Sequence, residues 1–291
     1  MNCSLGASVT LLAPAKVNLF LEVLARRADG YHQIETVMVA VSLFDQVDLV
    51  PATELRLSCS DPAIPSGPEN LAFRAALALK RAANVSAGAH IHLTKNIPAQ
   101  AGLAGGSSDA ATTLVGLNRL WNLNLSQDRL SEIAAEIGSD VAFFLFPPAA
   151  RCTGRGEKVE PIPVSNPLHL VLVCPVEGLS TADVYRRVAV PASVRSSDAI
   201  CAALQAGDAQ AIGQELFNRL QEPAEALSAT VKRLRMALSD IAPKGCLMSG
   251  SGSSLFALCD SEAAAQKLAQ RLRVELTGDP APRVFVVRTV D

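Results

Sequence analysis

The segment Ile97-Pro98-Ala99-Gln100-Ala101-Gly102-Leu103-Ala104-Gly105-Gly106-Ser107-Ser108-Asp109-Ala110-Ala111 carries the strongest structural signal in this 291-residue chain. It joins a predicted strand that ends near Lys95 to a predicted helix that begins near Ser107. Glycines let a backbone approach a ligand closely, and the amide groups of such a loop and of a helix N-terminus attract anions. The segment therefore predicts a phosphate-binding loop. The glycines alone leave a second interpretation open, a plain helix entry capped by Ser107 or Ser108.

The sequence on both sides of this loop predicts a first half that opens with a sheet and continues with helices. Turn-forming residues at 26–30 separate the first two apolar, β-branched runs. Later runs have apolar residues at helical spacing, and Ser126 and Gly138 provide a cap and a stop. The predicted strands are Val17–Leu24, Thr36–Val50 and Ala89–Thr94, and the predicted helices are Leu71–Ala83, Ser107–Leu120 and Ser126–Ile137.

The second half predicts a smaller set of strands with helices between them. Pro161, Pro163 and Pro167 place a domain boundary near residue 160, which gives domains 1–160 and 161–291. A first half that opens with a sheet, followed by a second half of strands with helices between them, indicates an α+β protein. It does not indicate a protein in which strands and helices alternate regularly. The predicted elements are the strands Leu168–Val173, Ser254–Cys259 and Val284–Val287, alanine-rich helices between about 197 and 239, and a helix at 261–273.

Composition and charge exclude several classes of protein. With 49% hydrophobic residues and a net charge of -2, the chain is an ordinary globular protein and needs no nucleic-acid partner. It opens without a signal peptide and has no long apolar span, so we expect a cytoplasmic protein with no membrane partner. Its seven cysteines form no CxxC pair and its four histidines have no metal spacing, which predicts buried thiols and no structural zinc site.

The chain has no GxxxxGK[ST] motif, so a different phosphate-binding architecture must apply. The loop resembles the central motif of the superfamily of galactokinase, homoserine kinase, mevalonate kinase and phosphomevalonate kinase. Two further segments agree: APAKVNLFL at 13–21, followed by RADGYH at 27–32, resembles an opening motif, and MSGSGSSLF at 248–256 resembles the third glycine motif, with Gly250 and Gly252. The DGYH element narrows the resemblance to a member of the non-mevalonate isoprenoid pathway.

This resemblance covers essentially the whole chain and implies a fold and a reaction. The implied fold is a two-domain α+β architecture, with an N-terminal ATP-binding domain built on a mixed sheet, a C-terminal ferredoxin-like sandwich, and a substrate cleft between them. The implied reaction transfers a phosphoryl group from ATP to the 2-hydroxyl group of a cytidine diphosphate ester of methylerythritol. Mg2+ is expected to bind mainly through the phosphates, and the protein is expected to be a monomer or a weak homodimer.

The resemblance assigns the catalytic base to Asp140 and its cationic partner to Lys16. A carboxylate at the mouth of an apolar strand can accept the proton of the substrate hydroxyl. A nearby ammonium keeps that carboxylate ionised and offsets developing negative charge. Taken alone, Asp140 is a turn or cap residue and Lys16 a solvated lysine, and only the motif context reverses that interpretation.

The resemblance assigns ATP to the loop from Pro98 to Ser108, with Asn70 and Lys95 beside the nucleotide. Glu69-Asn70 is open to a second interpretation as a helix cap. The loop departs from the family pattern at Gln100 and Ala104, where glycine is common, and we interpret each as a residue with a negative φ.

The acceptor site implied by the resemblance contains Asn18, Tyr31, His32, Thr181 and Tyr185. Aromatic rings can stack on the two faces of a cytosine, each contact contributing about 1–3 kcal/mol, while an imidazole can bind its polar edge. Without that context, the tyrosines are half-buried aromatics with hydrated hydroxyl groups.

Three other functions remain as alternatives. The first is another kinase of the same superfamily, for which the DGYH element is the discriminating feature. The second is a nucleotide-binding module without catalysis, which an intact Lys16 and Asp140 disfavour. The third is an NAD-dependent oxidoreductase, suggested by Gly250-Ser251-Gly252, which lacks the third glycine and the following acidic residue of a dinucleotide-binding loop.

Overall fold

The computed structural model describes residues 7–146, 148–278 and 280–290 and divides the chain into two compact units. The first unit consists of Met1–Ala15, Leu43–Ile97 and Ala104–Phe146, and the second of Lys16–Ser42, Pro98–Leu103 and Pro147–Asp291. This division differs from the single boundary predicted near residue 160. The reason is that the two long strands β1 (Val9–Arg26) and β2 (His32–Ala52) each contribute residues to both units.

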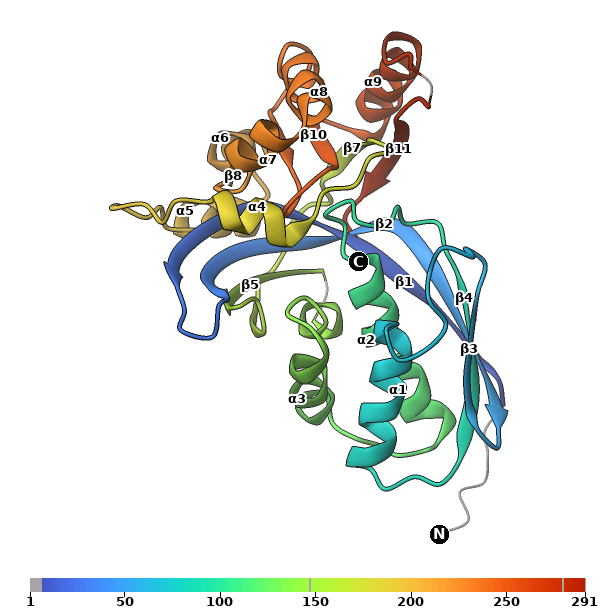
Figure 1. Cartoon of the computed structure of the whole chain (residues 1–291). Coiled ribbons are helices and arrows are strands. Elements are labelled where there is room, and N and C mark those ends of the chain that lie inside the picture. The colour runs from blue at the N-terminus through green and yellow to red at the C-terminus, as the bar shows by residue number, and fades with distance from the viewer. Residues whose placement is uncertain (1–6, 147, 279, 291) are drawn as a thin grey trace. The chain divides into compact units, whose positions relative to one another are not determined.

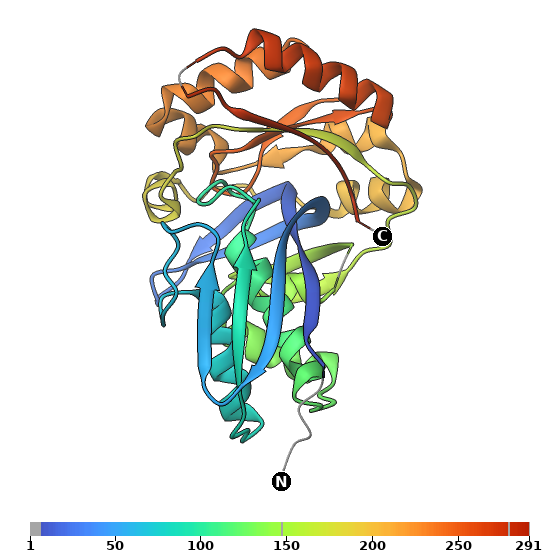
Figure 2. The ribbon, with the colours of Figure 1, turned by 90° about the vertical axis from the view of Figure 1, so that its right-hand side faces the viewer.

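The first unit packs helices against one face of a sheet. Its strands follow the order β3-β4-β2-β1, where β3 is Leu55–Cys59 and β4 is Gly88–Thr94. β4 is antiparallel to β2 and parallel to β3. Figure 2 shows α1 (Leu71–Ala82), α2 (Gly105–Leu120) and α3 (Gln127–Ile137) behind these strands.

Local sequence explains where these helices begin and end. α1 buries Ala72, Ala75, Ala76 and Leu79, the spacing of one helical face. The Ser126 side chain caps α3 by accepting a hydrogen bond from the Arg129 amide at 3.2 Å, and Gly138 follows its last residue, both as predicted. The helices of this unit are therefore set largely by periodicity and capping.

Two details of the first unit differ from the sequence prediction. The apolar run after Asp140 forms a 3-10 helix, η1 (Ala142–Leu145), and not a strand, because its residues pack against α2 and α3 instead of pairing in the sheet. Helix α2 begins at Gly105, two residues before the predicted start at Ser107. Glycines disfavour a helix only weakly, and here Gly105 and Gly106 form its first turn.

The second unit contains the remaining lengths of β1 and β2 and three shorter strands. The order is β8-β1-β2-β5-β6, where β5 is Ala149–Gly154, β6 is Lys158–Pro161 and β8 is Phe217–Asn218. β8 runs parallel to β1, and β5 runs antiparallel to β2.

A second sheet of four antiparallel strands carries the C-terminal core of the same unit. Its order is β11-β7-β10-β9, and helices α8 (Ala229–Ser239) and α9 (Glu262–Glu275) cover one face (Figure 1). The succession β7-α8-β9-β10-α9-β11 is the ferredoxin-like pattern. The predicted C-terminal sandwich is thus confirmed. The strands are β7 (His169–Cys174), β9 (Cys246–Met248), β10 (Leu255–Cys259) and β11 (Arg283–Arg288).

Four further helices lie between β7 and α8 in sequence: α4 (Thr181–Arg187), α5 (Asp198–Ala206), α6 (Ala209–Glu215) and α7 (Gln221–Leu227). The six cysteines among the described residues form no disulfide bond, and Cys3 lies outside the described residues. The described helices are too short or too polar to span a lipid bilayer.

Candidate active site

The second unit brings together residues from all three predicted motifs around the carbonyl group of Gly102. Lys16 is 3% exposed, and its Nζ donates to the Gly102 carbonyl at 2.9 Å and to Asn18 Oδ1 at 2.5 Å. Ser249 Oγ donates to the same carbonyl at 2.9 Å. Segments that are far apart in the sequence therefore meet at one backbone oxygen.

Two glycines allow this close approach. Gly102 has φ +75°, and a Cβ added there would lie 2.1 Å from the Ser249 carbonyl oxygen. Gly250 has φ +56°, and an added Cβ would lie 3.1 Å from Lys16 Nζ. Gly252, the other predicted glycine of the third motif, donates its amide to the Ser249 carbonyl at 2.9 Å. Side chains larger than hydrogen would separate the motifs.

Gln100 and Ala104 both have a left-handed backbone, with φ +52° and +55°, so the expectation of a negative φ at these positions was wrong. Such a conformation costs a non-glycine residue about 1–2 kcal/mol. The loop holds both residues there through its other contacts. Among these, the Ala101 carbonyl accepts the Ser254 amide at 3.1 Å, and the Leu103 carbonyl accepts the Lys16 amide at 3.1 Å.

The amino-terminal end of α2 has the features of an anion site. Its N-cap residue Ala104 makes no side-chain cap, and the first turn contains no acidic residue. Neither Ser107 nor Ser108 caps the helix. The alternative interpretation, a helix start capped by one of these serines, is therefore wrong. The Ser108 hydroxyl is buried without a hydrogen-bond partner. First-turn amides without a side-chain acceptor are the groups that bind phosphate oxygens at helix starts.

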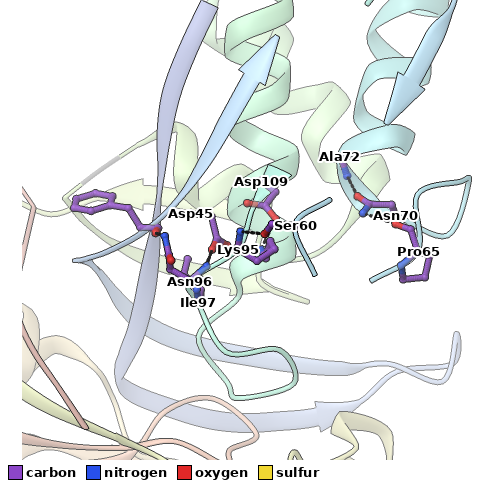
Figure 3. Close-up of polar contacts among 10 residues, drawn as sticks. Asp45, Ser60, Pro65, Asn70, Ala72, Lys95, Asn96, Ile97 and Asp109 are labelled. Carbon is purple, nitrogen blue, oxygen red and sulfur yellow. Dashed lines mark hydrogen bonds and ion pairs between the residues drawn. The ribbon is translucent and has the colours of Figure 1, made fainter. Parts of the chain in front are cut away.

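Lys95 lies in a buried ionic cluster with two aspartates of the first unit (Figure 3). Its Nζ contacts Asp45 Oδ2 and lies 2.5 Å from Asp109 Oδ2. Burial raises the pKa of Asp109 to about 7, although the Lys95 charge opposes that rise. Burial alone lowers the pKa of Lys95, and the two aspartates reverse this and raise it. Lys95 is therefore a paired ammonium group in this structure.

The sequence analysis missed both aspartates. Asp45 comes from β2 and Asp109 from α2, and they meet Lys95 just after β4. No local sequence pattern predicts the contact of Lys95 with these aspartates. The contact depends on the register in which Gln46 of β2 lies opposite Thr94 of β4. The only available signal was the presence of acidic residues inside otherwise apolar segments.

Asn70 is the N-cap of α1, as the second interpretation of Glu69-Asn70 predicted. Its Oδ1 accepts the Ala72 amide at 2.9 Å, and its Nδ2 donates to the Pro65 carbonyl at 2.8 Å (Figure 3). A role beside the nucleotide stays a prediction for Asn70. The same holds for Asp140, which lies half-buried in the turn between α3 and η1 of the first unit.

The predicted acceptor residues form two aromatic contacts in the second unit. The His32 and Tyr185 rings lie 5.1 Å apart between centroids. The Arg155 guanidinium carbon lies 5.1 Å from the centroid of the Tyr31 ring, whose residue is 54% exposed. Burial, with a smaller effect of the Arg26 charge, holds the pKa of His32 below its usual value, which favours the neutral imidazole.

The predicted acceptor positions contact Ser251 of the third glycine motif and Arg155, a residue that had no sequence signal. Thr181 Oγ1 shares a hydrogen bond of 2.9 Å with Ser251 Oγ, which connects α4 to the third glycine motif. Arg155 lies in the turn between β5 and β6, and only its contact with Tyr31 distinguishes it from other charged turn residues. Asn18, the remaining predicted residue, donates its Nδ2 to Thr36 Oγ1 at 2.8 Å.

Known proteins resemble this chain along nearly its whole length. Residues 70–147 match the family model described as GHMP kinases N terminal domain, and residues 200–276 match the model described as GHMP kinases C terminal. The 4-diphosphocytidyl-2-C-methyl-D-erythritol kinase of Symbiobacterium thermophilum is 44% identical over 280 residues, 95% of this chain and 98% of that protein. The enzyme of the same name from Shouchella clausii is 42% identical over 267 residues, 91% of this chain and 90% of that protein.

A solved structure described as 4-(cytidine 5'-diphospho)-2C-methyl-D-erythritol kinase superimposes on this chain with a TM-score of 0.81. It is 35% identical and covers 97% of this chain and 100% of its own. The homoserine kinase of Cytophaga hutchinsonii, at 23% identity and a TM-score of 0.78, has the same fold.

Proposed function

Because this chain belongs to the GHMP kinases, and within them to the 4-diphosphocytidyl-2-C-methyl-D-erythritol kinase family, we propose that it phosphorylates 4-diphosphocytidyl-2-C-methyl-D-erythritol on its 2-hydroxyl group. The hydroxyl oxygen bonds to the γ-phosphorus of ATP, the bond from that phosphorus to the β–γ bridging oxygen breaks, and ADP leaves. The hydroxyl proton passes to a base on the protein. This reaction belongs to the synthesis of isoprenoid precursors by the non-mevalonate route.

The amino-terminal end of α2 is the observation on which the proposal depends. A triphosphate needs several hydrogen-bond donors close together, and the uncapped first turn offers the amides of Gly105, Gly106 and Ser107. The helix dipole adds partial positive charge at the same end. We assign the β- and γ-phosphates to this turn and to the loop from Pro98 that leads into it. The nucleotide would extend from there toward Asn70 and Lys95.

We assign the role of base to Asp140 and the role of electrostatic partner to Lys16. The Lys16 ammonium group is buried and is held by Asn18 and the Gly102 carbonyl, so its charge has a defined position beside the loop. Phosphoryl transfer has a loose transition state, and positioning and charge neutralisation supply most of its acceleration. A fixed ammonium group suits that task. Asp140 would then take the proton that the acceptor hydroxyl releases.

The acceptor is assigned to Asn18, Tyr31, His32, Thr181 and Tyr185, with Arg155 added from the structure. Tyr31 has one face against the Arg155 guanidinium and much of its surface exposed. A guanidinium at this position would attract the anionic diphosphate of the acceptor. A neutral His32 keeps one ring nitrogen as an acceptor for the exocyclic amine of cytosine.

The described side chains do not fit a magnesium cage. Among residues 7–146, 148–278 and 280–290, no three histidine, cysteine, aspartate or glutamate side chains are grouped to hold a metal ion. Mg2+ commonly binds through substrate phosphates and water with few protein ligands. We therefore propose that it enters with ATP, bound to the phosphate oxygens, where it neutralises their charge.

An ADP-release assay on the purified protein tests the substrate assignment. The acceptors to compare are 4-diphosphocytidyl-2-C-methyl-D-erythritol, homoserine, mevalonate and galactose, each at several concentrations with ATP and Mg2+. We expect release of ADP with the first acceptor alone. Activity with only one of the other three would refute the proposal.

Asp140→Asn tests the assignment of the base. The amide keeps the size of the side chain but cannot take up the proton, so we expect turnover to fall at least about a hundredfold. Binding of ATP, measured by calorimetry, should change less than about threefold, because the base contacts the acceptor hydroxyl and not the adenine nucleotide. Near-normal turnover in a folded variant would remove Asp140 from this role.

A further inference from the structure

A buried cluster of three charged side chains lies directly against the first residue of α2. Lys95, Asp45 and Asp109 have side chains that are 7%, 0% and 3% exposed. A Cβ added to Gly105 would lie only 3.3 Å from Asp45 Oδ2. The cluster is therefore close to the helix start that we assign to the phosphates (Figure 3).

The two carboxylates of the cluster have unequal surroundings. Asp45 Oδ1 accepts the backbone amides of Asn96 at 2.6 Å and Ile97 at 2.9 Å, and its Oδ2 contacts Lys95. Asp109 Oδ2 lies against Lys95, while its Oδ1 is buried and has no hydrogen-bond partner. One ammonium group cannot balance two carboxylates. A proton added to the cluster therefore belongs on Asp109.

Few other charged groups act on Asp109. The charges that influence its pKa are those of Lys95 and Asp45. On β4, His90 and His92 both bond to Ser58 Oγ, and on β2, Asp48 bonds to Thr10 and Gln46. The elements that pack on α2 bury apolar residues, namely Ala72, Ala75, Ala76 and Leu79 of α1, Leu130, Ile133, Ala134 and Ile137 of α3, and Ala142, Phe143 and Leu145 of η1.

We propose that Asp109 takes up a proton when ATP binds at the amino-terminal end of α2, and that this single carboxyl group couples nucleotide affinity to pH. The inference rests on the proposed function, since it takes the helix start as the phosphate site. Asp45 acts as a positioning residue, because its contacts with two backbone amides and Lys95 hold the ammonium group beside Asp109.

Electrostatic repulsion supplies the coupling. Bound triphosphate places negative charge near α2, and an ionised Asp109 adds another negative charge in a region with little water to screen it. The complex therefore favours the neutral carboxyl. A proton from solvent moves to the carboxylate, and no other bond is made or broken. The pKa of Asp109, about 7 in the free protein, is higher in the complex.

The direction of the pH dependence follows. Below pH 7, Asp109 is protonated in both the free and the bound protein, and ATP affinity is highest. As the pH rises above 7, binding requires proton uptake, and the dissociation constant increases by at most about tenfold per pH unit. It levels off once the pH exceeds the pKa of Asp109 in the complex.

Calorimetry of ATP binding in buffers of different ionisation enthalpy measures this proton directly. The titration uses the full chain at pH 7.5 with saturating Mg2+ and no acceptor. We expect the unmodified protein to take up about 0.3 to 0.8 proton per ATP. Asp109→Asn should take up none, because an amide imitates the neutral carboxyl. At pH 8.5 this variant should bind ATP up to about thirtyfold more tightly than the unmodified protein.

Asp128→Asn is the matched control, since Asp128 is an exposed aspartate in the first turn of α3 in the same unit. It should behave as the unmodified protein does. ATP binding without proton uptake would overturn the inference, and so would equal uptake by Asp109→Asn.

Carbon-13 NMR of the Asp109 carboxyl in the unmodified protein keeps the test valid if Asp109→Asn does not fold. An upward shift of its pKa on ATP binding supports the inference, and an unchanged value overturns it. A folded protein that binds no ATP at all would refute the proposed function as well. The two failures are thus distinguishable.

Discussion

Single residues carry most of the proposed chemistry, and their surroundings determine what each can do. Lys16 was assigned as the partner of the catalytic base and Lys95 to a position beside the nucleotide, and the two lysines have different contacts. Lys16 contacts neutral oxygens of Asn18 and Gly102 in the hydrogen bonds described above, whereas Lys95 contacts two carboxylates. An ammonium group between two carboxylates has little positive charge left to offer a phosphate. Lys95 is therefore placed to hold Asp109.

The proposed stacking of Tyr185 on the cytosine of the acceptor is likewise a contribution of a single side chain. Tyr185→Ala removes an aromatic surface worth about 1–3 kcal/mol to a stacked base, so we expect the KM of the cytidine-containing acceptor to rise about ten- to a hundredfold. The KM of ATP should remain within about twofold. Steady-state kinetics with each substrate varied in turn provides the measurement.

Tyr185→Phe is the control for that experiment, because it keeps the ring that lies against His32. Its acceptor KM should stay within about threefold of the unmodified value. If Tyr185→Ala raised both KM values equally, the acceptor assignment would be wrong.

At the scale of elements, hydrogen bonds to its backbone carbonyls hold the loop between β4 and α2. The carbonyls of Ala101, Gly102 and Leu103 all accept hydrogen bonds from residues distant in sequence. These contacts fix the loop in a shape that places Gln100 and Ala104 in the left-handed region. A loop held in this way presents its amides without rearrangement when a ligand binds, which lowers the entropic cost of binding.

Gly102→Ala tests this account of the loop. The added Cβ would overlap the Ser249 carbonyl oxygen at 2.1 Å, and alanine disfavours φ +75°. We expect the free energy of unfolding to fall by about 3 kcal/mol, from strain and overlap together. Urea unfolding followed by far-ultraviolet circular dichroism gives the value.

Gly106→Ala is the matched control, since an added Cβ there meets only Leu71 Cδ1 at 3.7 Å, an ordinary contact. Alanine in a helix is favoured over glycine by about 0.5–1 kcal/mol, so the control should be as stable as the unmodified protein or slightly more. Equal destabilisation by the two substitutions would mean that the Ser249 contact is unimportant.

At the scale of the whole molecule, two long strands are shared by both compact units. β1 and β2 each start in one unit and end in the other, so neither unit can lose its sheet without disrupting strands that the other uses. Each unit nonetheless has its own core. The first buries Trp121, whose indole donates to the Gly88 carbonyl at 3.2 Å, and the second buries Cys174 and Cys259.

Shared strands predict cooperative unfolding, and these residues can report it. Trp121 is the only tryptophan, so its fluorescence follows the first unit, while labelling of Cys174 and Cys259, quantified by mass spectrometry, follows the second. We expect the two urea midpoints to coincide. Leu238→Ala, in the core of the second unit, should lower both midpoints together through a loss of about 2–5 kcal/mol. Separate midpoints would show that the units unfold independently.

The sequence by itself determined the type and order of the longest strands and helices and the membership of the chain in its family. Helix α3 with its Ser126 cap and helix α1 follow from periodicity and capping, which are properties of neighbouring residues. The ferredoxin-like C-terminal pattern was implied by the resemblance to the family. The three motifs likewise depend on residues close together in the chain. Local physics and motif composition were sufficient for these conclusions.

Only the tertiary structure decided which distant side chains meet. The pairing of Lys95 with Asp45 and Asp109, the Arg155 contact with Tyr31 and the left-handed backbone at Gln100 all depend on contacts between remote segments. A one-residue change of strand register would direct Asp45 to the opposite face of the sheet. Such contacts are set by the packing of the whole chain, and for that reason no local pattern marked the buried charged cluster around Lys95.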